Sequence, residues 1–154
     1  MIESVNIDIF KSTVGVISQS CNCFHTMSAG FAKHIKQLYP EAYEADCKTE
    51  CGDIKKLGTI SIAKIKNPAL ELKYIINLYS QFYYGRDKRY TDYNAMTKGF
   101  SLIYNFLKEK DLILGIPRGM GCNLAGGDWK IVESIIRAEF ETSTIKVFIC
   151  NKPQ

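Results

Sequence analysis

Residues 112–129 read LILGIPRGMGCNLAGGDW, an apolar run followed by a glycine-rich segment and a tryptophan. The apolar run Leu112–Ile116 predicts a strand, which Pro117 ends because proline removes a backbone donor. Four glycines lie within residues 119–127, and Trp129 opens a segment with apolar residues at helical spacing. The stretch therefore predicts a strand, a loop whose backbone is open to a ligand, and a helix. It is neither a Walker loop nor a G-x-G-x-x-G motif.

Strand and helix periodicities alternate over the rest of the chain. Strands are expected at residues 5–9, 14–20, 59–65, 74–79, 112–116 and 145–149. Helices are expected at residues 28–39, 41–49, 96–107 and 129–140. We expect Ser28 to cap the first helix, Thr91 or Asp92 to cap the third, and Ile60 and Ile62 to face inward. Because several strands lead directly into helices, the order predicts an α/β fold, a three-layer α/β/α sandwich with a central mixed sheet.

The composition is that of an ordinary globular domain. A chain of 154 residues with 46% hydrophobic and 23% charged residues is expected to form a single domain over residues 1–154, and it is neither disordered nor collagen-like. The net charge of +4 permits an anionic ligand but does not indicate wholesale nucleic-acid binding. No apolar stretch of about 20 residues occurs, and the first residues lack a basic leader. We therefore expect a cytoplasmic monomer with no membrane or nucleic-acid partner.

The six cysteines raise the question of a metal site or a thiol nucleophile. They include C-x-C and C-x3-C pairs, but neither pair has the C-x2-C spacing of a zinc knuckle, and the chain holds only two histidines, His25 and His34. In a reducing compartment free thiols are the default. Cys23 or Cys122 would act as a nucleophile only with a lowered pKa. We expect no metal and no cofactor.

A second strand-to-helix connection is rich in small residues. Residues 19–30 read QSCNCFHTMSAG and follow the buried strand expected at residues 14–20. Small residues let the backbone approach a ligand, and the free N–H groups of a helix start favour an anion such as phosphate. Taken alone, the segment is also explained by a tight turn with Ser28 as the cap. Paired with residues 117–129 at the same edge of a sheet, it predicts a diphosphate held from two sides.

Four segments in order resemble the macrodomain family of ADP-ribose-binding modules. Residues 6–10 resemble the family's G-D-I-F segment, and residues 19–30 resemble its V-N-C…M-G-A-G-I-A loop. Residues 77–81 resemble its N-L-x-x-Q strand, and residues 117–129 resemble its P-x-x-G-x-G-L…W segment. The ending LAGGDW is most similar to the small phage-type and fungal-type ADP-ribose-1″-phosphate phosphatases, a branch that also includes the terminal ADP-ribose glycohydrolase.

The resemblance implies an ADP-ribose ligand and a set of binding residues. Asp8 would accept a hydrogen bond from the adenine amino group, with the Ile9 backbone beside it, although a strand-terminal Asp can also simply face solvent. Asn22 would bond hydroxyls of the distal ribose, and its residue type also suits an Asx turn. The other binding residues that the resemblance implies are Gln19, Met27, Ala29, Gly30, Phe31, Gly119, Gly121, Cys122, Asn123 and Leu124.

Two residues are candidates for catalysis. Asp128 could orient or deprotonate a water that attacks a terminal phosphate, or it could cap the following helix. His25 could donate a proton to the leaving ribose oxygen, or it could lie exposed without a role. The terminal glycohydrolase uses a lysine nucleophile and an aspartate, whereas Gln81 and Ala125 stand near those positions here. A covalent lysine mechanism is therefore not expected.

The expected reaction is hydrolysis of ADP-ribose-1″-phosphate to ADP-ribose and phosphate, as the resemblance implies. Two other functions stay open: a non-catalytic reader of ADP-ribosyl groups, and a hydrolase that removes ADP-ribose from protein or nucleic acid. Residues 83–93 interleave tyrosines with Arg86, Lys88 and Arg89. This segment could form a basic lid over the distal phosphate, a stacking surface for nucleic acid or a solvated loop.

Overall fold

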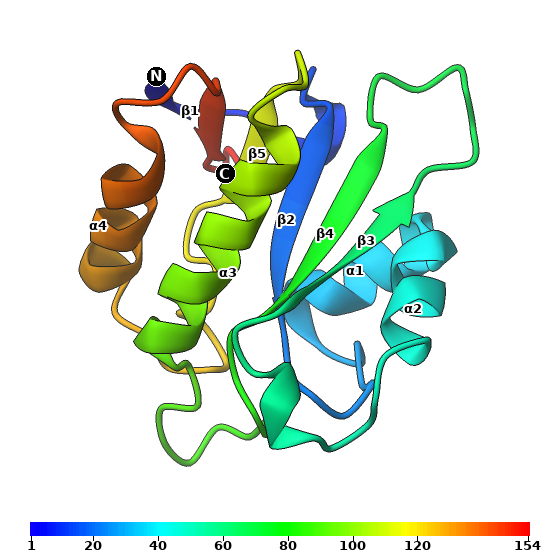
Figure 1. The fold of residues 1–154 in the computed structure, drawn as a ribbon, viewed down its shortest axis with the longest axis vertical. Coiled ribbons are helices and arrows are strands. Elements are labelled where there is room, and N and C mark those ends of the chain that lie inside the picture. The colour runs from blue at the N-terminus through cyan, green and yellow to red at the C-terminus, as the bar shows by residue number, and fades with distance from the viewer.

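The computed structural model describes residues 1–154 (Figure 1). One sheet holds the strands β1 (Ile2–Val5), β2 (Val16–Cys21), β3 (Ile60–Lys64), β4 (Tyr74–Tyr79), β5 (Leu114–Pro117) and β6 (Val147–Cys150). The helices are α1 (Gly30–Leu38), α2 (Pro40–Cys47), α3 (Tyr93–Leu107) and α4 (Trp129–Phe140), with short 3-10 turns η1 (Ile9–Lys11) and η2 (Ile54–Lys56). α3 and α4 cover one face of the sheet, and α1 and α2 cover the other.

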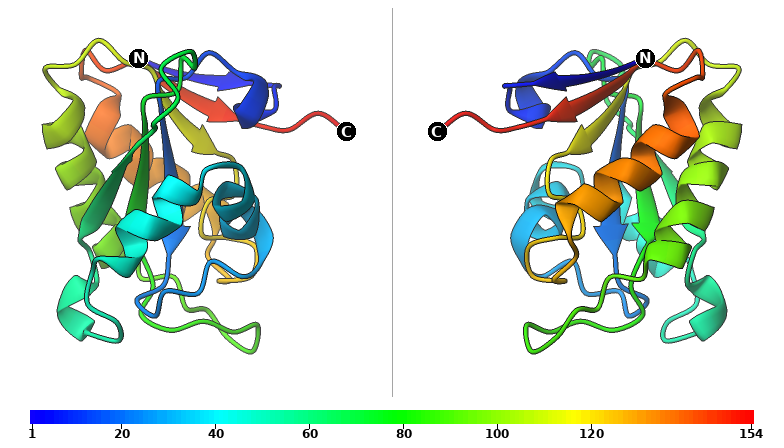
Figure 2. Two further views of the ribbon diagram at one scale, coloured as in Figure 1. Left: turned by 90° about the vertical axis from the view of Figure 1, so that its right-hand side faces the viewer. Right: turned by 90° about the vertical axis from the view of Figure 1, so that its left-hand side faces the viewer.

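The sheet is mixed, as expected. Its strand order is β1-β6-β5-β2-β4-β3, and every neighbouring pair is parallel except β3 and β4. The predicted three-layer α/β/α sandwich is confirmed. Because β2, β4 and β5 run in the same direction, the loops that follow them gather at one end of the sheet, the lower end in Figure 2.

Alternation along the strands separates the two largest of the three hydrophobic clusters in the core. On β4, Ile75 packs on the α1 and α2 side and Ile76 on the α3 and α4 side, and both side chains are fully buried. The apolar stripe predicted for the third helix is likewise buried against the sheet: Met96, Phe100, Ile103 and Leu107. No helix of the chain is long and apolar enough to cross a membrane.

Two strand predictions are wrong in detail. The period-two pattern at residues 5–9 does not continue as a strand, because β1 ends at Val5 and the backbone then turns into η1. Asp8 stabilises this turn, since its Oδ1 accepts a hydrogen bond from the N–H of Phe10 at 3.0 Å. Ile62 was expected to face inward but is 37% exposed, because β3 is an edge strand that the helices cover only in part.

The helix boundaries follow local chemistry. Asp92 caps α3 through a hydrogen bond from the N–H of Ala95, as predicted. Pro40 separates α1 from α2 and also opens α2, where its missing N–H leaves no intrahelical bond unmade. The cap expected at Ser28 is not formed, and this difference bears on the site.

Candidate functional site

A cavity of about 300 Å³ opens at the carboxyl ends of the central strands. Its walls come from the β2–α1 loop, the segment after β4 and the β5–α4 loop, together with one residue of α2, Asp46. This is the end of the sheet at which parallel α/β folds bind ligands.

The first wall is the start of α1. The N-cap residue is Ala29, whose side chain cannot cap, so the N–H groups of the first helical turn receive no side-chain partner. Ser28, expected to be the cap, instead lies exposed one residue earlier at the cavity wall. Gly30 takes φ +59°, a left-handed conformation that brings the chain into the helix. An uncapped helix start at a cavity wall is a site for negative charge.

The second wall is the glycine-rich β5–α4 loop. Consecutive turns shape it, with hydrogen bonds from the N–H of Met120 to the carbonyl of Pro117 and from the N–H of Cys122 to the carbonyl of Gly119. Gly121 has φ +75°, a left-handed conformation that favours glycine, and a Cβ there would lie 2.7 Å from the flexible end of Met96, at Cε. The two walls approach each other where Leu124 lies next to Gly30.

The third wall is the segment after β4. It is attached to the glycine-rich loop, because the N–H groups of Tyr90 and Thr91 both donate to the carbonyl of Ala125. The rings of Tyr83 and Tyr84 are in contact, tilted by 31° with centroids 4.5 Å apart, and both residues are exposed.

The basic residues of this segment point in different directions. Arg86 lines the cavity, whereas Lys88 lies over the Tyr90 ring and Arg89 over the Tyr93 ring. Of the expected basic lid, the structure therefore places only Arg86 at the cavity.

The charges at the cavity favour an anion. Arg86 and Arg118 line it, and Asp46 is the one carboxylate among the lining residues. Asp46 is 1% exposed and lies 3.9 Å from the ammonium of Lys56, itself 7% exposed. Because the buried cation balances this carboxylate, the two arginines determine the charge that a ligand meets. No three His, Cys, Asp or Glu side chains come together as a metal site would need.

Nine of the expected binding residues line the cavity: Asn22, Met27, Ala29, Gly30, Phe31, Gly119, Gly121, Asn123 and Leu124. Asn22 forms an Asx turn, with Oδ1 accepting from the N–H of Phe24 at 2.8 Å and Nδ2 donating to Thr26 Oγ1. One amide hydrogen of Asn22 is left for a ligand.

Two of the other expected binding residues, Asp8 and Ile9, lie in the turn after β1 and do not line the cavity. Ile9 is buried in the core, and the Asp8 carboxylate caps η1 beside Cys150. Burial, and secondarily the charge of Asp8, raises the pKa of Cys150 to about 11. Phe10 of the same turn stacks on the cavity residue Phe31, with centroids 5.4 Å apart. The turn is therefore held against the cavity wall.

Two other expected binding residues do not line the cavity. Gln19 is 1% exposed and does not line the cavity, because its amide donates to Asn77 Oδ1 at 2.9 Å inside the core. Cys122 also lies outside the cavity lining, with its thiol directed to the carbonyl of Met120. Burial, with a smaller contribution from the charge of Asp128, raises the pKa of Cys122 to about 11, and burial raises that of Cys23. Neither thiol has the lowered pKa that a nucleophile needs.

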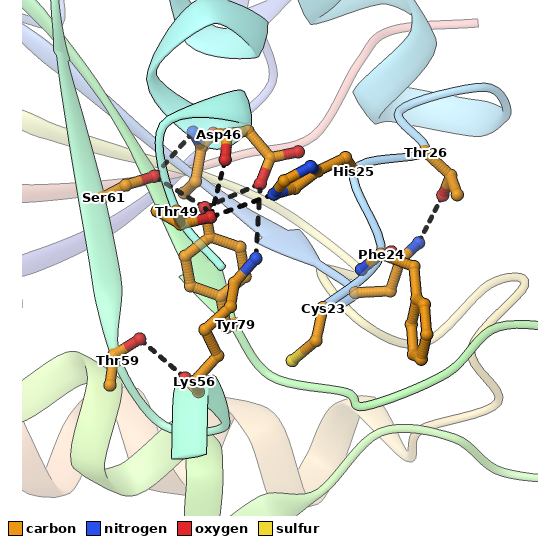
Figure 3. Close-up of polar contacts among 12 residues, drawn as sticks. Cys23, Phe24, His25, Thr26, Asp46, Thr49, Lys56, Thr59, Ser61 and Tyr79 are labelled. Carbon is orange, nitrogen blue, oxygen red and sulfur yellow. Dashed lines mark hydrogen bonds and ion pairs between the residues drawn. The ribbon is translucent and has the colours of Figure 1, made fainter. Parts of the chain in front are cut away.

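Neither expected catalytic residue lines the cavity. Asp128 is the N-cap of α4, and its Oδ1 accepts from the N–H of Lys130 at 2.9 Å, so the structure shows the capping role. His25, at φ +57°, has its Nε2 3.3 Å from Thr49 Oγ1 (Figure 3). Both side chains are held by partners outside the cavity.

Three residues that bear on the cavity were missed in the sequence. Asp46 and Lys56 are buried charges, and Ser20 lines the cavity with a buried hydroxyl that has no protein partner. For Asp46 a signal was present, since it follows the inward-facing Ala42 of α2 by one helical turn. A carboxylate on the inward stripe of a helix marks a buried polar position.

The comparisons agree with this architecture. No family model matches the chain. It is 37% identical over 124 residues to the uncharacterized 17.5 kDa protein in the tk-vs intergenic region of Enterobacteria phage T4, an alignment covering 78% of this chain and 76% of that protein.

Among solved structures, the macrodomain of Mycobacterium tuberculosis DarG superposes with a TM-score of 0.81 and 19% identity, covering 100% of this chain and 99% of that one. Thermosipho africanus DarTG, in complex with ADP-ribose, gives a TM-score of 0.77 and 20% identity over 97% of this chain and 41% of that one. The chain therefore belongs to the family of the phage T4 protein, and its fold is that of the macrodomains.

Proposed function

We propose that the cavity binds ADP-ribose and that the protein hydrolyses ADP-ribose-1″-phosphate to ADP-ribose and phosphate. One observation carries the binding proposal: the uncapped start of α1 and the glycine-rich loop form two walls of a cavity that Arg86 and Arg118 also line. Backbone N–H groups and arginines from two sides match the charge and spread of a diphosphate.

Each part of ADP-ribose has candidate partners. Asp8, in the turn that stacks on Phe31, would accept from the adenine amino group, with the Ile9 backbone beside it. Asn22 would bond the distal ribose with its free amide hydrogen, and the unpartnered Ser20 hydroxyl offers a second polar contact. The related fold of Thermosipho africanus DarTG, solved with ADP-ribose, supports this choice of ligand.

The phosphatase part of the proposal rests on charge and on the resemblance in the glycine-rich loop. A terminal phosphomonoester adds about 1.5–2 negative charges near neutral pH, and the two lining arginines suit a ligand richer in charge than ADP-ribose itself. Gln81 stands where the glycohydrolase has its lysine nucleophile. Its side-chain Nε2 donates a hydrogen bond to the backbone carbonyl of Tyr83.

Two measurements test this function. Calorimetry with ADP-ribose measures binding, and phosphate release from ADP-ribose-1″-phosphate in the presence of a chelator measures the reaction. We expect both from the wild type. Binding without release would leave a reader. Release of ADP-ribose from modified protein or nucleic acid, with no phosphate formed, would identify an ADP-ribosyl hydrolase instead.

Arginine variants connect the result to this cavity. Arg86→Gln and Arg118→Gln should each weaken ADP-ribose binding about tenfold or more, because a hydrogen bond to a charged group contributes about 1.5–3 kcal/mol. Arg137→Gln is the matched control, since Arg137 lies on α4 in ion pairs with Glu133 and Glu141. Equal effects of all three variants would show that the cavity arginines do not contact the ligand.

A further inference from the structure

The carboxylate of Asp46 is held at the cavity wall by a single hydrogen bond. Tyr79 donates to its Oδ1 at 2.7 Å, and this is the one hydrogen bond that the carboxylate accepts from the protein. Figure 3 shows this second oxygen without a dashed contact. Asp46 as a residue is 1% exposed and lines the cavity, so its second oxygen needs a water or a ligand hydroxyl as its donor.

Tyr79, which donates to Asp46 Oδ1, is the last donor in a chain of hydrogen bonds through the core. Gln19 Nε2 donates to Asn77 Oδ1 at 2.9 Å, and Asn77 Nδ2 donates to Ser61 Oγ at 3.0 Å. The Ser61 hydroxyl, 2.8 Å from Tyr79 Oη, is then free to donate to it, and Tyr79 donates to Asp46. Burial raises the pKa of Tyr79 well above its usual value, so its hydroxyl stays protonated and remains a donor. The chain fixes the orientation of the Asp46 carboxylate.

Lys56 supplies the opposite charge without occupying the free oxygen. Its Nζ lies 3.9 Å from Asp46 Oδ1 and 4.3 Å from the centroid of the Tyr79 ring, and it has no hydrogen-bond acceptor. A buried ion pair with so few hydrogen bonds adds little to the stability of the folded protein, because replacing such a pair by apolar residues of similar volume is often neutral or stabilising. Its effect at the cavity is to balance a carboxylate that would otherwise repel an anionic ligand.

Given the proposed phosphatase function, on which this step rests, we propose that Asp46 is the general base. As the oxygen of a water forms its bond to phosphorus, the water proton moves to Asp46 Oδ2. The bond between phosphorus and the 1″ oxygen breaks, and its electron pair stays on that oxygen. The proton then passes to the ribose oxygen, directly or through solvent, which gives ADP-ribose, phosphate and the original carboxylate. Tyr79 and Lys56 are positioning residues.

The test removes the base while keeping the site neutral. Asp46→Asn alone leaves Lys56 buried without a counter-charge, so the double variant Asp46→Asn/Lys56→Met accompanies it. We expect kcat for phosphate release to fall about 10²–10⁴-fold and Kd for ADP-ribose to stay within about threefold of wild type. Asp111→Asn, an exposed carboxylate before the start of β5, is the matched control and should leave both constants unchanged.

Tyr79→Phe is a third variant that keeps the aromatic ring and the carboxylate. It should lower kcat about tenfold with Kd unchanged, and this result decides the matter if the Asp46 variants do not fold. An unchanged kcat in Tyr79→Phe overturns the inference. A decrease in kcat of less than tenfold in the Asp46 variants also overturns it. Equal losses in kcat/KM and in ADP-ribose affinity also overturn it, because Asp46 would then bind a ligand hydroxyl. A wild type that releases no phosphate overturns the proposed function instead.

Discussion

Asp8 combines a structural contact with a place in the proposed site. Its Oδ1 accepts from the N–H of Phe10 and so closes η1, while Phe10 stacks on Phe31 at the cavity. The same carboxylate has unused acceptor capacity, since an ionised carboxylate accepts about four hydrogen bonds. A cap and an adenine contact can therefore share one side chain, and a matched variant separates the two roles.

Asp8→Ala should lower ADP-ribose affinity by about 1–3 kcal/mol, because the adenine amino group would lose its charged acceptor. It should also cost about 0.5–2 kcal/mol of stability through the lost cap. Asp53→Ala is the matched control, because Asp53 caps η2 in the same way, through the N–H of Lys55. Calorimetry and thermal melts of both variants measure the two effects. If Asp8→Ala melts like Asp53→Ala and binds like the wild type, Asp8 is a cap only.

The contacts of single residues could be predicted from the sequence where they depend only on residues nearby in the chain. The cap at Asp92 and the Asx turn at Asn22 depend only on neighbouring backbone groups, and both could be read from the sequence. The pairing of Asp46 with Lys56 could not, because one residue lies on α2 and the other in η2, and only the packing of both against β4 brings them together.

At the scale of elements, the close contact between α3 and β4 positions the segment that forms the third wall. Gly99 lies in α3 against Leu78 of β4, and a Cβ at Gly99 would lie 2.6 Å from Leu78 Cδ2 and 2.8 Å from Cδ1. The helix can approach the sheet so closely only because this position has no side chain. The sequence shows a glycine within a helical stripe, but the reason for it lies in the neighbouring strand.

Gly99→Ala should therefore destabilise the protein by about 1–3 kcal/mol, because the added methyl overpacks the core. At an exposed helix position, Gly→Ala would stabilise the protein by about 0.8–1 kcal/mol through its higher helix propensity. The change in stability expected for Gly99→Ala therefore has the opposite sign. Ser101→Ala, at an exposed position of the same helix, is the control and should change stability by less than about 0.5 kcal/mol. Denaturant unfolding of both variants measures the difference, and a more stable Gly99→Ala protein would contradict the packing argument.

Element boundaries were harder to predict than element types. Period-two spacing at residues 5–9 is compatible with either a strand or a turn whose apolar residues pack inward, and the Asp8 cap favours the turn. Ser28 is a good capping residue by type, yet the helix begins one residue later, which leaves the helix start open at the cavity. Both deviations lie next to the proposed site. Departures from local sequence preferences are expected at functional sites.

At the scale of the whole molecule, packing around the sheet determines which thiols are buried and how burial changes their pKa values. Six cysteines are free: Cys21, Cys23 and Cys150 are buried, Cys122 is half-buried, and Cys47 and Cys51 are exposed. The strand order that buries Cys150 depends on pairing β6 between β1 and β5, partners far apart in the chain, which local patterns do not specify. Burial, the largest cause in each case, raises the pKa values of the four protected thiols.

These raised pKa values predict a loss of stability at alkaline pH. A thiol whose folded pKa is about 11, as for Cys122 and Cys150, keeps its proton in the folded protein at pH values where the unfolded chain, near pKa 9, has released it. The unfolded state then binds fewer protons, so stability is complete below about pH 9 and falls as pH rises toward 11. The buried Tyr79 hydroxyl, whose pKa burial also raises, adds to the fall at the upper end.

Thermal melts from pH 7 to pH 11 in the presence of a reductant measure this fall. A thiol reagent at pH 7 should label the exposed Cys47 and Cys51 rapidly, and all six thiols only after unfolding. The double variant Cys47→Ser/Cys51→Ser is the matched control and should lose the rapid labelling while keeping the alkaline fall in Tm. A Tm that stays constant up to pH 11, or rapid labelling of more than two thiols in the native protein, would show that the protected thiols are not held in the core.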